Sequence, residues 1–455
     1  MNASAPATAA TRSLPRVVAA SLIGTTIEWY DYFLYGTAAA LVFNKLFFPN
    51  TDPLTGTLLS FLTYAIGFAA RPVGALVFGH FGDRVGRKKL LVVSLLLMGG
   101  STTLIGVLPT YSSIGAAAPV LLTVLRLVQG FALGGEWGGA VLLVSEHGDQ
   151  RRRGFWASWP QGGAPAGNLL AAGVLSLLTA VLSEDAFLSW GWRVPFLLSA
   201  VLVGVGLWIR LAVDESPLFK QALAAKQQRK TVEQPPLVAV LRNHWREVLV
   251  AMGARMAENI SYYVMTTFVL TYAVTHAHFS KQTALNAVLI GSAIQFALIP
   301  LFGALSDRVG RKPVYLVGAV GVGIWAFVFF GLVDTRSFGQ LVVAVTVGLV
   351  FHSAMYAPQA AFFSELFATR MRYSGASIGA QFASVAAGAP APLIATALLK
   401  DYGNATPISV YVAIAAAITV LAVLCGRETR GSDLADVEAA VEAEGAAVAA
   451  KPATA

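Results

Sequence analysis

Charged side chains are scarce in this 455-residue sequence. Asp, Glu, Lys and Arg make up only 12% of it, whereas hydrophobic residues make up 56%. A soluble domain carries about a quarter charged residues. Long apolar runs between short polar loops therefore indicate a polytopic membrane protein. The net charge of +8 does not predict nucleic-acid binding, because the basic residues gather at the ends of apolar runs and form no single patch.

Cysteines and cofactor motifs are nearly absent as well. The single cysteine, Cys425, excludes a disulfide framework and a thiolate metal site. No Glu-x-x-His pair or His/Cys cluster suggests a metal, and no glycine-rich stretch has the lysine of a phosphate-binding loop. We expect no cofactor and no ATP-driven step. Residues 1–10 lack the charged start and apolar core of a signal peptide, so we expect a disordered tail.

Apolar runs of about 20 residues or more are the most regular feature of the chain. Because hydrocarbon offers no partner to free backbone groups, these runs must be helices. The sequence therefore predicts an all-α polytopic membrane protein with twelve transmembrane helices. We expect the helices near residues 17–43, 57–79, 90–108, 119–145, 154–182, 193–213, 247–275, 283–305, 314–332, 339–365, 374–399 and 407–426.

The longest polar stretch between these runs, 214–246, divides the chain into two similar parts. We predict a disordered tail (1–13), a six-helix half (14–213), a linker loop (214–246), a second six-helix half (247–426) and a C-terminal tail (427–455). Lys and Arg are concentrated in alternate loops, so the positive-inside rule places those loops, and both termini, in the cytoplasm. The expected location is the inner (plasma) membrane.

A short basic motif occurs twice, 224 residues apart. Gly-x-x-x-Asp-Arg-Val-Gly-Arg-Lys begins at Gly79 and again at Gly303, each time between two apolar runs. Its Asp can pair with an Arg or with a helix N-terminus. Glu146 and Glu365 are each followed seven residues later by an arginine, which suggests a charged latch on each half rather than ordinary helix-end charge. The predicted gate comprises Gly79, Asp83, Arg84, Gly86, Arg87, Lys88, Glu146, Arg153, Asp307, Arg308, Gly310, Arg311, Glu365 and Arg372.

The duplicated motif resembles the signature loop of the major facilitator superfamily. Further stretches resemble its metabolite:proton symporter family, which includes carriers for shikimate, α-ketoglutarate, citrate and proline/betaine. These stretches are Gly24–Phe33, Phe47-Phe48-Pro49, Arg126–Trp137 and Trp190–Phe196. The resemblance extends over nearly all of residues 14–430. It implies two pseudo-symmetric six-helix halves around a midplane site, alternating access and coupling to protons.

Ionisable residues within the predicted helices are the candidates for proton coupling, because burial in a membrane is costly and usually functional. Glu28 and Asp31 lie three residues apart and so share a helix face. Asp31 is slightly favoured. Glu136 is a third candidate, in the fourth helix with Arg126. Alternatively, these acids only pair with arginines of neighbouring helices and hold the bundle together.

Substrate binding is predicted from polar stripes at helical spacing. Arg255, Glu258, Asn259 and Tyr262 form such a stripe, which suits an anion, although Arg255 and Glu258 could also satisfy each other. The pair is more typical of shikimate-type than of betaine-type carriers. The other candidates are polar side chains facing the same expected cavity: Arg126, Gln161, Asn168, Tyr356 and Gln359.

Three further polar residues stay undecided at this stage. Arg71 could face the cavity or reach toward an interface, and Gln381 is a weaker cavity candidate. A lone histidine in an apolar helix, here His352, is more often a hydrogen-bonded core residue than a titrating group.

The sequence thus predicts a secondary active transporter that is not an enzyme. It would import a small organic metabolite, most plausibly a carboxylate, together with protons, across a lipid bilayer and as a monomer. The alternatives are a zwitterion (proline/betaine-type) symporter, a drug exporter and a sensor without transport.

Overall fold

The computed structural model describes residues 8–75, 77–78, 87–134, 150–212, 245–366, 382–388 and 390–431. Within them the regular structure is entirely helical. The first-half helices are α1 (Thr8–Leu41), α2 (Phe43–Leu46), α3 (Pro53–Ala69), α5 (Arg87–Val107), α6 (Tyr111–Ile114), α7 (Ala117–Leu133), α9 (Arg153–Gln161), α10 (Gly163–Val181), α11 (Glu184–Ala186) and α12 (Arg193–Ala212). The second-half helices are α15 (Trp245–Tyr263), α16 (Val269–Thr275), α17 (Lys281–Val309), α18 (Arg311–Asp334), α19 (Phe338–Leu366), α21 (Ala391–Tyr402) and α22 (Thr406–Cys425).

The long helices account for twelve successive spans when α9 is joined to α10, and α15 to α16. In the described residues, six helices are long and apolar enough to cross a membrane, or seven if the bent pair Glu184–Gly191 and Arg193–Ile209 counts as one span. The predicted domain bounds stay predictions, since residues 213–244, which contain most of the linker, lie outside the described part.

Local sequence explains where several helices begin and bend. Asp52 caps α3 by accepting from the Thr55 N–H, and Pro53 follows it at the first helical position. Between α15 and α16 the chain forms a π-helical turn, Val264–Phe268. Such turns are rare in helices and are frequent at functional sites.

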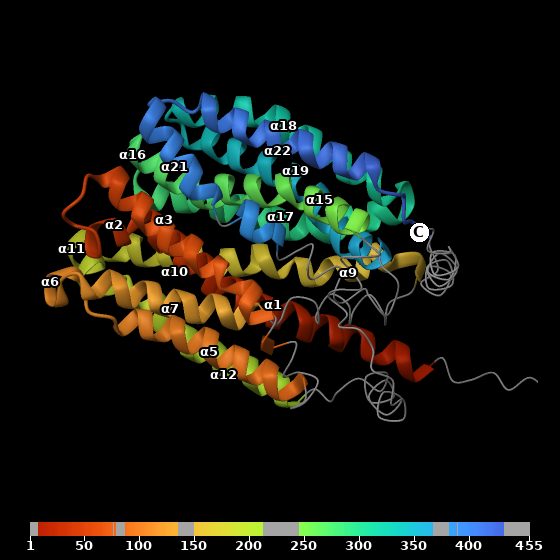
Figure 1. Cartoon of the computed structure of the whole chain (residues 1–455), viewed down its shortest axis with the longest axis horizontal. Coiled ribbons are helices and arrows are strands. Elements are labelled where there is room, and N and C mark those ends of the chain that lie inside the picture. The colour runs from red at the N-terminus through yellow and green to blue at the C-terminus, as the bar shows by residue number, and fades with distance from the viewer. Residues whose placement is uncertain are drawn as a thin grey trace, which may run out of the picture.

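The twelve helices lie side by side, with the two halves packed along α10 and α17 (Figure 1). The start of α1 and the end of α22 lie at one end of the bundle, which we call the terminal end. The short helices α2, α6 and α11 lie at the opposite end, which we call the far end (Figure 1).

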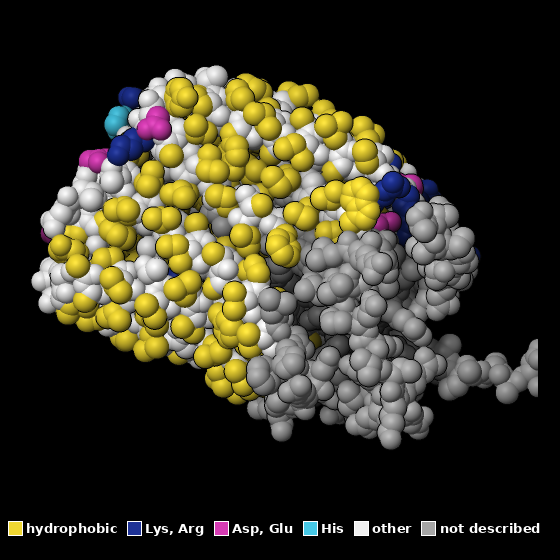
Figure 2. Space-filling model, viewed as in Figure 1, with side chains coloured by type: hydrophobic (Ala, Val, Ile, Leu, Met, Phe, Trp, Pro, Cys, Tyr) yellow, Lys and Arg dark blue, Asp and Glu magenta, His cyan; other side chains and the backbone are white. Residues whose placement is uncertain are grey.

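Apolar side chains cover the middle of the visible surface, and charged ones gather at its two ends (Figure 2). Leu177, Ile324 and Leu421 are each more than 60% exposed. Large apolar side chains exposed in such a band are suited to lipid rather than to water. The structure is therefore that of a membrane-spanning protein, as the sequence predicts.

Candidate functional site

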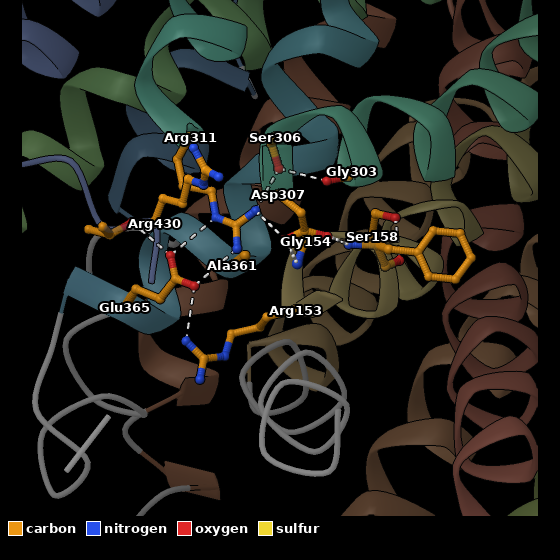
Figure 3. Close-up of polar contacts among 12 residues, drawn as sticks. Arg153, Gly154, Ser158, Gly303, Ser306, Asp307, Arg311, Ala361, Glu365 and Arg430 are labelled. Atoms are coloured by element: carbon orange, nitrogen blue, oxygen red, sulfur yellow. Dashed lines mark hydrogen bonds and ion pairs between the residues drawn. The ribbon is translucent and has the colours of Figure 1, made fainter. Parts of the chain in front are cut away.

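A buried ion-pair network joins the two halves at the terminal end (Figure 3). Arg153, at the start of α9, donates to Glu365 of α19 with an Nη1–Oε1 distance of 3.0 Å. Arg311 of α18 donates to both oxygens of the same carboxylate at 3.2 Å. These three side chains are at most 2% exposed. With Asp307, described next, we call them the latch.

Asp307 of α17 links this network to a helix terminus. Its Oδ1 accepts from Arg311 Nη1 at 2.7 Å, and its two oxygens accept from the backbone N–H groups of Gly154 and Phe155 at 2.8 and 2.9 Å. Those N–H groups open the first turn of α9, where a negative charge is favoured by the helix dipole. The second-half motif therefore holds the first-half helix directly.

Two glycines allow this close approach of α9 and α17. A Cβ on Gly154 would lie 2.3 Å from Arg311 Nη1 and 2.6 Å from the Gly303 carbonyl oxygen. A Cβ on Gly303 would lie 2.6 Å from the Gly154 carbonyl oxygen. Larger residues at either position would therefore separate the two helices.

The segment after α22 supports the latch from outside. The Glu428 carboxylate accepts from the backbone N–H groups of Arg311 at 2.9 Å and Lys312 at 3.0 Å, and Thr429 Oγ1 donates to Glu365 at 2.7 Å. Burial alone would raise the pKa of Glu428, but these backbone N–H groups outweigh it and hold that pKa below its usual range.

The predicted gate residues are distributed unevenly in the structure. The latch pairs Glu365 with Arg153 across the halves, whereas the sequence suggested a separate latch on each half; spacing along one chain cannot reveal partners 212 residues apart. Gly310 turns the chain with φ +117°, and Arg308 is exposed. Of Arg87 and Lys88 only the backbone, in the first turn of α5, is described. Gly79, Asp83, Arg84, Gly86, Glu146 and Arg372 lie outside the described residues.

A second buried cluster surrounds Glu258 of α15. Its carboxylate lies 3.6 Å from Arg255 Nε and accepts from Asn259 at 3.1 Å. From α19, His352 Nε2 and Gln359 Nε2 each approach it at 3.3 Å. Every member is at most 4% exposed. The charge of Arg255 is therefore balanced by Glu258 on the same helix.

The hydrogen bonds around His352 define its tautomer. Gln295 of α17 places its amide nitrogen, a donor, 2.7 Å from His352 Nδ1, so Nδ1 is the acceptor and Nε2–H faces Glu258. The ring also packs at a tilt against Tyr262 and Tyr356, with centroids 4.6 and 5.2 Å apart.

The first half contains its own polar chain around Asp31 of α1. Asp31 is fully buried, with Oδ1 accepting from Ser199 at 2.6 Å and Oδ2 without a hydrogen-bond partner. Arg126 donates to Gln129, which donates in turn to Thr102 at 2.8 Å. Arg126 is near enough to interact electrostatically with Asp31 but forms no salt bridge with it.

The remaining predicted site residues do not belong to the clusters around Glu258 and Asp31. Glu28 is half-buried on the same helix as Asp31, and Glu136 lies outside the described residues. Gln161 donates across the halves to the Tyr356 carbonyl at 3.3 Å, and Asn168 donates to Ser292 at 3.0 Å. Both amides, Gln161 at the end of α9 and Asn168 in α10, thus stabilise the interface with the second half in this conformation.

A small cavity of about 10 Å³ lies between the halves, scarcely room for one water molecule. It is lined by Trp29 and Ala164 from the first half and by Glu258, Asn259, Tyr262, Tyr263, His352 and Tyr356 from the second. The Glu258 cluster therefore faces the interface between the two halves.

Ion pairs also link the halves at the far end. Glu184 lies 2.8 Å from Lys45 and 3.2 Å from Lys281, and Lys400 lies 3.8 Å from Asp52. We call these the far-end pairs. The Glu184 side chain is 61% exposed and the Asp52 side chain 57%. Salt screens such exposed pairs.

Sequence reasoning missed several members of these clusters. His352 stayed undecided, and Gln295 and Tyr263 were not singled out. A signal existed for His352, which shares a helix face with Tyr356 and Gln359. The contribution of Gln295 could not be found in this way, because its hydrogen bond joins residues 57 positions apart.

Known transporters match this chain over nearly its whole length. The family model "Sugar (and other) transporter" matches residues 17–234 and 219–441. The shikimate transporter of Escherichia coli is 38% identical over 91% of this chain and 95% of its own length. The inner membrane metabolite transport protein YhjE of the same bacterium is 41% identical over 92% and 95%. A proline/betaine transporter of Escherichia coli is 32% identical over 92% and 85%.

A solved structure of the proton:xylose symporter XylE superposes with a TM-score of 0.74, at 18% sequence identity, over 94% of this chain and 99% of the other. At that identity the likeness shows the fold alone, which is the twelve-helix major facilitator fold. The sequence identities of the relatives, and the share of their length that they match, show the family as well. The chain therefore belongs to the sugar (and other) transporter family of the major facilitator superfamily, among its bacterial carriers of metabolites.

Proposed function

We propose that this transporter takes up a small organic carboxylate together with protons, by alternating access. The observation that carries the proposal is Asp31, a fully buried acid with one carboxylate oxygen unpartnered beside an arginine. An acid in this position can bind a proton without any cofactor. The relatives include a shikimate transporter, which supports a carboxylate as the substrate.

In the proposed cycle the terminal end faces the cytoplasm, and the latch closes that side. The basic residues of the alternate loops support this orientation through the positive-inside rule. Opening must break the pairs of Arg153 and Arg311 with Glu365, while the far-end pairs stay formed. Each protein molecule would complete this cycle as a monomer, driven by the proton gradient.

The experiment is uptake of labelled organic acids into proteoliposomes under an imposed proton gradient. Wild-type protein should concentrate one or more acids, and dissipating the gradient should abolish accumulation. Asp31→Asn keeps the shape of the side chain but cannot carry the proton, so it should abolish accumulation while exchange of internal for external substrate continues. Undiminished accumulation by Asp31→Asn would exclude Asp31 as the coupling acid.

A zwitterion is the second candidate substrate. The cavity has three tyrosines and Trp29 around Glu258, a combination that suits a quaternary ammonium group. Betaine carriers are among the relatives. Glycine betaine in the same uptake assay separates the two candidates.

A further inference from the structure

Two arginines of the first half lie together in an aromatic pocket that none of the contacts above explains. The Arg71 guanidinium carbon lies 3.9 Å from the Phe68 ring centroid and 4.9 Å from that of Tyr32. The Arg126 guanidinium carbon lies 5.0 Å from the Tyr32 centroid and 4.4 Å from that of Tyr35. Both cations therefore lie against the same Tyr32 ring.

Neither arginine has an ion-pair partner among the described residues. Arg71 is 6% exposed, and its Nε is buried without a hydrogen-bond partner. Arg126 is 2% exposed, donates to the neutral Gln129 and leaves Nε unpaired. Cation–π contacts offset part of the cost of burying these charges but not the loss of their hydrogen bonds.

The charges of the two halves differ in consequence. Away from the latch, the described side chains of the first half that are buried and ionisable are Arg71, Arg126 and Asp31, which are two basic groups for one acid. In the second half Arg255 is balanced by Glu258. An incoming anion is therefore favoured in the first half, where it would supply the missing charge.

The packing around Arg126 and the tyrosine hydroxyl groups also suit a binding site. Arg126 lies directly against Gly67 of α3, where a Cβ would come within 2.7 Å of Arg126 Cγ, so the glycine leaves the space that this side chain occupies. The hydroxyl groups of Tyr32 and Tyr64 are buried beside two cations, and they interact with each other without forming a hydrogen bond of ordinary geometry. A bound anion would offer both hydroxyl groups a stronger acceptor.

Tyr263 separates this pocket from the small cavity between the halves. Its ring centroid is 5.9 Å from that of Tyr32, and it lines the cavity with Trp29. Tyr263 is the last residue of α15 before the π-helical turn. A rearrangement of that turn would open the pocket to the cavity.

We propose that Arg71 and Arg126 together bind the carboxylate of the substrate within the aromatic pocket of Tyr32, Tyr35, Tyr64 and Phe68. Two guanidinium groups supply several donors in planar arrays that fit a carboxylate, and Tyr32 and Tyr64 donate beside them. The substrate's remaining body then extends past Tyr263 toward the Glu258 cluster. This inference rests on the proposed function in taking the substrate to carry a carboxylate, and it moves the anion site from Arg255 to Arg71 and Arg126.

The test is equilibrium binding to protein in lipid nanodiscs, without a proton gradient. The probes are labelled shikimate, its uncharged methyl ester and glycine betaine, followed by benzoate, 2-oxoglutarate and citrate. Arg71→Gln should weaken binding of the bound carboxylate roughly ten- to a hundredfold, since one charge-assisted set of bonds is lost. Arg71→Lys should recover only part of the loss. Binding of the methyl ester should be weak and unaffected by either change.

The matched control is Arg193→Gln. Arg193 also lies over an aromatic ring, Trp192, at 4.6 Å, but it donates to the carbonyls of Gly106 and Leu108 and should not affect probe binding. Wild-type affinity in Arg71→Gln would overturn the proposal, and so would a wild-type protein that binds none of the carboxylates. If Arg71→Gln does not fold, equal wild-type affinity for shikimate and its methyl ester would overturn it instead.

The outcomes also separate this inference from the proposed function. Arg71-dependent binding without gradient-driven accumulation would reject proton-coupled uptake and keep the carboxylate site. Accumulation that Arg71→Gln leaves unchanged would reject the carboxylate site and keep proton-coupled uptake. Shikimate binding without betaine binding identifies an organic acid as the ligand, and betaine binding without shikimate binding identifies a zwitterion. In both cases, weaker binding in Arg71→Gln supports the carboxylate site.

Discussion

The two ends of the bundle are both closed by ion pairs between the halves, but the pairs differ in kind. The latch side chains are between 1% and 8% exposed and share two carboxylates among two arginines and a helix N-terminus. The far-end pairs are mostly exposed, up to 61%. A buried pair is costly to break by removing one partner, whereas an exposed pair contributes at most about 1 kcal/mol.

This difference teaches which end sets the conformational equilibrium. If the latch opens, four buried charges must find water or new partners at once, so the terminal end should behave as an all-or-none switch. Each far-end pair can break separately, because its exposed side chains are hydrated by the surrounding water. We therefore expect substitutions at the terminal end to change the populations of the two conformations far more than substitutions at the far end.

The largest effect is expected for Glu365→Gln. It leaves Arg153 and Arg311 buried without their shared countercharge, which should destabilise the closed terminal end by about 3–5 kcal/mol. Spin labels at Arg152→Cys and Arg308→Cys, two exposed positions, in a Cys425→Ser background report the separation of the halves. Their distance distribution should shift to longer values. An unchanged distribution would contradict the role of the latch, and Asp401→Asn, an exposed acid at the far end of α21, is the control.

Gly154→Ala should have the next largest effect, because its new Cβ would lie 2.6 Å from the Gly303 carbonyl and push α9 from α17. Overpacking of this kind costs about 1–3 kcal/mol. Maleimide labelling of Ser158→Cys, which is buried against Gly303, should speed up in a Cys425→Ser background. Gly173→Ala is the matched control, since its Cβ would meet only Leu289, at an ordinary 3.7 Å. Equal labelling rates in both alanine variants would argue against tight packing at the latch.

Glu428→Gln tests the support given by the segment after α22. The side chain is partly exposed, so we expect a loss of about 1 kcal/mol of stability at pH 7. Because the pKa of Glu428 is lowered in the folded protein, its contribution is complete above the unfolded pKa of about 4.3 and is lost as the pH falls through the folded value. The difference in thermal unfolding midpoint between wild type and variant should therefore shrink on acidification below about pH 4.3. A difference that grows instead would reverse the sign of this linkage.

The smallest effect is expected for Glu184→Gln at the far end. The carboxylate is mostly exposed and is shared by Lys45 and Lys281, so its removal should change the conformational equilibrium by no more than about 1 kcal/mol. Spin-label distances at the terminal end should change slightly at low ionic strength and not at all at high salt. A shift as large as that of Glu365→Gln would show that the two ends are equivalent and remove the basis of the comparison.

The fold was predictable because apolar length and the duplicated motif are local properties of the sequence. The prediction of a gate Asp that meets an arginine or a helix N-terminus describes Asp307, which does both. The partners in the latch were not predictable, since Arg153 and Glu365 are brought together only by the packing of α9 on α19. Arg71 and Arg126 likewise show no sequence relation; it is their common contact with the Tyr32 ring that joins them.

The smallness of the central cavity has a consequence for the electrical properties of the membrane. A space of about 10 Å³ cannot hold a file of water molecules, and hydrogen-bonded water is what conducts protons between separated groups. We therefore expect no proton conduction through this cavity in this conformation, so a charge that crosses the bilayer during the cycle moves through the field of the membrane potential. Each full elementary charge moved through that field exchanges about 2.3 kcal/mol per 100 mV.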